Sequence, residues 1–72
     1  GAAKIDITAN TINVTNTSDD GLGLSAFSNG QMNITGNLTV TAEHAIDVRG
    51  NSKVNINEKG EHSTVLNGDI VF

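Results

Sequence analysis

The sequence of 72 residues contains no cysteine, proline, tryptophan or tyrosine, and only two phenylalanines. The absence of cysteine excludes disulfide bonds, thiolate metal sites and a cysteine nucleophile, so the cross-links that stabilise many very small domains are not available. A chain this short forms one domain at most and buries a smaller share of its surface than larger domains do. Its stability must therefore come from side-chain packing and backbone hydrogen bonds.

Positive charge is also scarce. Four basic residues are scattered along a chain with eight acidic ones, which gives a formal net charge of −4. Because no basic patch can neutralise phosphates, we expect no nucleic acid as a partner. No apolar run approaches the ~20 residues that a membrane helix needs, and no signal-peptide pattern opens the chain. We therefore expect no direct insertion of this segment into a membrane.

A five-residue pattern recurs along the chain, as KIDIT at 4–8, QMNIT at 31–35 and KVNIN at 53–57. Each copy places apolar residues two apart between polar ones, which is typical of a strand with one buried face. A fourth copy begins with DIVF at 69–72. The intervals are typical of solenoids and other repeat architectures. Disorder, the alternative, is disfavoured by this regular alternation and by a charged fraction of only 17%.

The recurrence predicts an all-β fold, a parallel β-helix in the form of a single-stranded solenoid of about three uncapped coils. Residues 1–72 would form a single unit. Its parts would be coil one at 4–30, coil two at 31–52, coil three at 53–68 and the start of a next coil at 69–72. Strands are expected at 4–9, 11–15, 21–27, 31–35, 37–41, 45–49, 53–57 and 63–67. Glycine and asparagine recur between the strands, where corners need positive φ.

Stacked coils would place like residues over one another, because adjacent strands lie ~4.8 Å apart along the axis. One predicted column contains Ile5, Met32, Val54 and Ile70, and a second contains Ile7, Ile34, Ile56 and Phe72. The other side chains expected to point inward are Ile12, Val14, Leu22, Leu24, Leu38, Val40, Ile46 and Val48. Asn33 over Asn55 suggests an outward column of amides, as in other stacked strands.

An antiparallel sandwich or meander is the alternative fold. Asn29-Gly30 and Asn67-Gly68 are two-residue hairpin signals between alternating strands. A sandwich does not require whole three-strand blocks to recur in phase, however, so we favour the parallel arrangement.

Residues 36–72, GNLTVTAEHAIDVRGNSKVNINEKGEHSTVLNGDIVF, resemble the passengers of bacterial autotransporters in the adhesin-like group. The matching features are an apolar strand at 45–48, a Gly/Asn/Ser corner at 50–52, a V-x-I strand at 53–57 and an N-G-D-I step at 67–70. The first half of the chain matches more loosely. The resemblance implies a right-handed parallel β-helix and export to the outer surface of a Gram-negative bacterium. It brings no catalytic residues, because the matching positions are structural.

These observations favour a non-catalytic structural stalk or adhesin segment of a cell-surface or secreted passenger protein, with no cofactor. One alternative is an adhesin module that binds a host-surface or cell-surface ligand through loops at 16–20, 42–44 and 58–62. Another is a fragment of a polysaccharide-degrading β-helix enzyme, whose acids would be Asp19, Asp20, Glu43 and Asp47. Uncapped strand edges also predict end-to-end self-association.

Candidate binding residues have simpler interpretations. Asp19-Asp20 supplies too few oxygens for Ca²⁺, which takes six to eight ligands. His62 with Glu58 or Glu61 could bind a metal ion, but lone surface histidines are commonplace, so we predict no metal site. His44 is expected near the acidic loop at 16–20, as a weak charge pair when protonated.

Four N-x-S/T triplets begin at Asn13, Asn16, Asn33 and Asn37. As N-glycosylation acceptors they matter only in a secreted eukaryotic protein. Strand alternation produces the same pattern by itself, so we interpret these asparagines as polar strand and surface positions.

Overall fold

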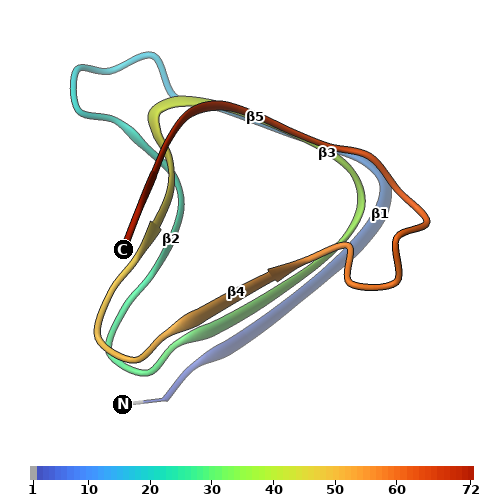
Figure 1. The fold of residues 1–72 in the computed structure, drawn as a ribbon, viewed down its shortest axis with the longest axis horizontal. Coiled ribbons are helices and arrows are strands. Elements are labelled where there is room, and N and C mark those ends of the chain that lie inside the picture. Colours follow the sequence, from blue (N-terminus) through green and yellow to red (C-terminus); the bar gives the residue numbers. More distant parts are fainter. Residues whose placement is uncertain (1) are drawn as a thin grey trace.

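The computed structural model describes residues 2–72. It contains five strands in one sheet, and the paired strands run parallel to one another. The strands are β1 (Lys4–Thr15), β2 (Leu22–Ala26), β3 (Gln31–Val48), β4 (Lys53–Ile56) and β5 (Thr64–Val71). In Figure 1, β1, β3 and β4 lie side by side, whereas β2 and β5 lie along other parts of β3. No helix among the described residues is long and apolar enough to cross a membrane.

Strand β3 organises the sheet. Its first part, residues 31–34, is bonded to β1 on one side and β4 on the other. Its middle part pairs with β1 and β5, and its last part pairs with β2 and β5. The other strands have β3 as their only strand partner among residues 2–72. Most of the hydrogen bonds between strands are therefore made by this one 18-residue strand.

The predicted three-coil β-helix is wrong. The structure has one open five-stranded sheet in the order β1-β3-β2, with β4 and β5 also bonded to β3, in place of three coils of separate strands. The corners expected at Asn10 and Gly36 and the loop expected at 42–44 lie inside β1 and β3. Backbone pairing continues through these positions with shifts of register rather than ending at them. The boundary expected between residues 68 and 69 likewise falls inside β5.

The predicted parallel register of the first three repeats is confirmed. The pairs are Ile5–Met32, Ile7–Ile34, Met32–Val54 and Ile34–Ile56. The fourth copy does not continue these columns, because Ile70 pairs with Ile46 of β3. The reason is that β5 enters the sheet with Thr64 opposite Leu38. Residues 69–71 have therefore already reached the last part of β3.

The antiparallel alternative is also excluded for the described strands, since their pairs are parallel. Asn29-Gly30 lies in a turn between β2 and β3, in which the Gly30 N–H donates to the Phe27 carbonyl at 3.0 Å. Ser28 and Asn29 both have positive φ there. Asn67-Gly68 lies inside β5 rather than in a hairpin.

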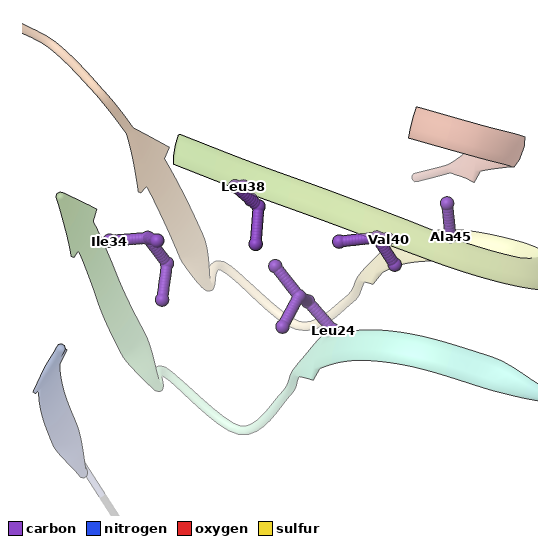
Figure 2. Packing of buried hydrophobic residues seen from close by; sticks show 5 residues of the cluster. All are labelled: Leu24, Ile34, Leu38, Val40 and Ala45. Atoms are coloured by element: carbon purple, nitrogen blue, oxygen red, sulfur yellow. The ribbon is translucent and has the colours of Figure 1, made fainter. Parts of the chain in front are cut away.

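The apolar core lies between β2 and successive parts of β3. Figure 2 shows five of its side chains converging from these strands. The buried apolar residues are Leu24, Ala26, Ile34, Leu38, Val40, Ala42, Ala45 and Ile46. Half-buried side chains that pack against this cluster are Ile12, Val14, Met32, Ile56 and Leu66. The buried positions lie mainly on β3, because only there does sheet cover both sides of a strand.

The predicted inward set is therefore correct at its centre and wrong at its margins. Large apolar side chains that were expected inside but are exposed are Ile5, Ile7, Leu22, Ile70 and Phe72. The first four lie on strands with a neighbour on one side only, so no further layer covers them. Three buried alanines, at positions 26, 42 and 45, were absent from the prediction. Asp47 is also buried and accepts a 2.8 Å bond from Arg49 Nε.

Candidate functional site

A row of amide and carboxylate side chains crosses the outer side of β1, β3 and β4. Asn55 Nδ2 donates to Asn33 Oδ1 at 2.8 Å, and Asn33 Nδ2 donates to Asp6 Oδ1 at 2.7 Å. Gln31 Nε2 lies 3.4 Å from the same Asn33 oxygen. The row follows from the parallel register, which sets Asp6 beside Asn33 and Asn33 beside Asn55. The amide column expected from the sequence is confirmed, and Asp6 is its additional member.

A loop projects beside this row between β4 and β5, as the orange excursion in Figure 1. Asn57 closes its base, because its Oδ1 accepts from the Gly36 N–H at 2.9 Å. Asn57 Nδ2 donates to the Gly36 carbonyl at 2.8 Å, to Thr64 Oγ1 at 2.9 Å and to the Ser63 carbonyl at 3.3 Å. One side chain thus connects both ends of the loop to β3.

Sequence reasoning treated Asn57 only as the last polar position of a repeat. The signal that could have identified it is an asparagine at the entrance to a loop, since asparagine tolerates positive φ and hydrogen-bonds nearby backbone. Its φ is 48°. The following turn is closed by the Gly60 N–H, which donates to the Asn57 carbonyl at 2.9 Å.

Between this row and the loop lies a hollow of about 300 Å³, which we call the loop groove. Its strand side is formed by Thr8, Thr35, Asn33 and Asn55, and its other side by residues 58–62. These loop residues comprise two glutamates, a lysine, a glycine and a histidine. Of the three loops predicted to bind ligand, the one at 58–62 therefore borders a groove.

The polar groups of the loop groove are largely unengaged. Within residues 2–72, the side chains of Glu58, Lys59, Glu61 and His62 make no ion pair or hydrogen bond with the protein. Asn55 uses its amide nitrogen in the row across the strands, which leaves its oxygen without a protein donor. In the described part of the chain, no group of three or more His, Asp or Glu side chains could hold a metal ion.

The other two predicted loops meet at a different corner of the molecule. Residues 16–20 do form a loop between β1 and β2. Residues 42–44 belong to β3, so the prediction of a loop there is wrong. Glu43 Oε2 accepts from the Asp20 N–H at 2.7 Å. His44 Nε2 lies 3.8 Å from Asp20 Oδ1, which confirms the expected neighbourhood of His44 and the acidic loop.

The four acids of the enzyme hypothesis, Asp19, Asp20, Glu43 and Asp47, do not line the loop groove. Asp47 is buried against Arg49. Glu43 is bonded to the backbone of the 16–20 loop instead.

The asparagines of the N-x-S/T triplets have structural contacts at three of the four positions. Asn33 belongs to the row across the strands. Asn37 Oδ1 accepts from the Ser63 N–H at 3.1 Å. Asn16 connects the ends of its own loop, since its Nδ2 donates to the Leu22 carbonyl and its Oδ1 accepts from the Ser18 N–H.

A second hollow, of about 400 Å³, lies where the first residues of β1 and β3 meet the end of β2. Ile5, Phe27 and Met32 form much of its apolar lining. Ile5 and Phe27 are among the exposed large hydrophobic residues of the chain.

No protein-family model, curated protein or solved structure matches this chain.

Proposed function

We propose that this chain is a non-catalytic structural segment, a stalk or adhesin piece of an autotransporter passenger displayed on or secreted from a Gram-negative bacterium. The observation that carries the proposal is the parallel, in-register stacking of the repeats on β3. Such stacking pairs backbone groups between like segments and buries aliphatic side chains between them. The resulting unit holds its shape without cross-links or cofactors.

The outer side of the sheet supports the same role. The side chains of the row across β1, β3 and β4 form hydrogen bonds that join neighbouring strands. The asparagines at the loop bases likewise join the loop to the sheet. A chain that crosses the cell envelope unfolded must refold outside without assistance. Local repeats and the absence of cysteine suit that requirement, because no disulfide has to form correctly.

Surface display tests this proposal. The chain is fused to the translocation domain of an autotransporter in a Gram-negative host, with an epitope tag at its outer end. We expect the tag on the cell surface and a protease-resistant chain behind it. Ile34→Asp is the matched control, because it places a carboxylate in the core at a position that is only 2% exposed. This variant should be displayed but degraded. Retention of the native chain inside the cell, or its digestion as fast as the control, would contradict the proposal.

A further inference from the structure

We propose that the loop groove binds a short stretch of a neutral, polyhydroxylated ligand, namely an oligosaccharide chain. A volume of about 300 Å³ lies at the small end of ligand pockets. It suits part of a sugar chain lying across the strands better than a whole drug-sized molecule. The inference adds a binding role to the structural one and rests on the groove alone.

The groove offers both acceptors and donors of hydrogen bonds. The carboxylates of Glu58 and Glu61 accept, and the Lys59 ammonium donates. Sugar hydroxyls do both, so one ligand can engage the two kinds of group together. Hydrogen bonds to charged groups are roughly twice as strong as neutral ones. The glutamates are therefore the residues on which affinity should depend most.

The groove is also preorganised. Asn57 ties both ends of the loop to β3. The hydrogen bonds to Asn33 and Asn55 fix the orientation of the strand side. A ligand consequently loses little affinity to the ordering of the loop backbone.

Charge narrows the ligand class. Two glutamates border the groove in a protein of net charge −4, which disfavours phosphates and other anions. A basic peptide is the competitor, because the two glutamates outnumber the one lysine of the loop, and tetralysine is the probe that distinguishes it from a saccharide. No aromatic ring lines the groove, so hydrogen bonds must provide the affinity. We expect dissociation constants of about 1 mM.

Titration of the isotope-labelled chain, followed by amide NMR shifts, tests the inference. The probes are cellohexaose, maltohexaose and chitotriose, each taken to about ten times the expected dissociation constant. Tetralysine is the cationic comparison. We expect at least one saccharide to give saturable shifts at residues 58–62, Asn33 and Asn55. Shifts with tetralysine alone, shifts elsewhere only, or no saccharide shifts would overturn the inference.

Matched variants test which carboxylates contribute to the affinity for saccharide. Glu58→Gln combined with Glu61→Gln keeps the shape and removes the charge, and should weaken saccharide binding about tenfold. Glu43→Gln makes the same change beside the 16–20 loop and should leave the affinity unchanged. Glu58 and Glu61 are exposed, so the double variant should keep the amide dispersion of the native chain. Equal affinity in the double variant and the native chain would overturn the assignment of these carboxylates.

Discussion

The burial of Ile34 shows how the exposure of a side chain depends on the number of neighbouring strands. It lies at the centre of the sheet, paired with Ile7 on one side and Ile56 on the other, and is 2% exposed. Ile5 has the same side-chain type but lies on β1, which has one neighbouring strand, and is 50% exposed. Ile7, which has the position of Ile34 in the repeat, also lies on β1 and is 38% exposed. The number of surrounding strands, and not the place in the repeat, therefore decides which isoleucine is buried.

Ile34→Asp should abolish cooperative folding. A buried unpaired carboxylate costs several kcal/mol, whereas the core of so small a domain rarely supplies more than about 3–5 kcal/mol. Ile5→Asp should leave the chain folded, because water reaches that position. Thermal unfolding followed by circular dichroism distinguishes the variants. A cooperative transition in Ile34→Asp, at the native temperature, would remove Ile34 from the core.

Asn57 is the second residue on which the structure makes a specific prediction. Asn57→Ala leaves the Gly36 backbone groups without their partner and forces alanine to a φ of 48°. We expect a loss of about 1–3 kcal/mol in the free energy of unfolding, measured by urea denaturation. Asn55→Ala, which loses one outward hydrogen bond, should cost less.

Asn57→Gly separates the two effects, because glycine tolerates the backbone conformation but cannot form the hydrogen bonds. It should lie between the native chain and the alanine variant. Faster exchange of the Gly36 amide, whose N–H donates to Asn57 Oδ1, should accompany the loss in both variants. Native exchange at this amide would show that Asn57 does not hold the loop.

At the scale of elements, two glycines let long strands continue where corners were expected. Gly36 of β3 and Gly68 of β5 have φ of 149° and 145°. A Cβ at Gly36 would clash with the Ala9 carbonyl oxygen, and one at Gly68 with the Ala42 carbonyl oxygen. Close approach of two backbones is what these positions require, and glycine alone permits it.

Alanine at either glycine should therefore destabilise the chain strongly. We expect Gly36→Ala and Gly68→Ala to cost about 1–3 kcal/mol in backbone strain, with the steric clash in addition. Gly60→Ala is the matched control, because Gly60 also has positive φ but its Cβ would meet nothing within 4 Å. That variant should cost about 1 kcal/mol. Equal midpoints of urea denaturation for the three variants would contradict the close-approach explanation.

At the scale of the whole molecule, the exposed apolar residues lie on two opposed edges of the sheet. Ile5 and Ile7 lie on β1, and Ile70 lies on β5. Strands β1 and β4 pair with the same residues 31–34 of β3 from its two sides. The β1 edge of one copy therefore matches in register the β4 and β5 edge of another, and the apolar hollow beside Ile5 would be covered in such a contact.

We expect the isolated 72-residue chain to associate head to tail at high concentration, through unpaired strand edges. Sedimentation velocity should show oligomers that grow with concentration. Ile5→Lys and Ile70→Lys each block one edge and should be monomeric alone, since an edge lysine opposes strand addition. An equimolar mixture should form a discrete heterodimer, because each variant keeps the edge that the other lacks.

A native chain that stays monomeric up to about millimolar concentration would contradict this expectation. A mixture of the two variants that behaves like either variant alone would show that association does not use these opposed edges. Far-UV circular dichroism of each variant checks that the sheet is intact before mixing.

The residue types that line the loop groove could be predicted from the sequence, but the position of the loop could not. The polar character of residues 58–62 and the stacking of Asn33 on Asn55 were accessible, because both follow from local composition and strand period. That the loop stands beside Asn33 and Asn55 was not, since it depends on Asn57 binding Gly36 and Thr64 at once. The contact with Gly36 joins residues 21 apart in the chain, and alternation does not encode it.

The alternating pattern in the sequence was sufficient to predict that most of the chain is extended and that the first three repeats lie parallel in register. A period of two specifies which side chains share a face, and like apolar residues align like segments. The position of β5 and the burial of each isoleucine follow instead from tertiary contacts. These contacts also join the expected separate strands into a long β3 with partners on both sides. Burial and strand continuity depend on how many neighbouring strands cover each position, and a repeat that looks alike at the centre and at the edge cannot specify that number.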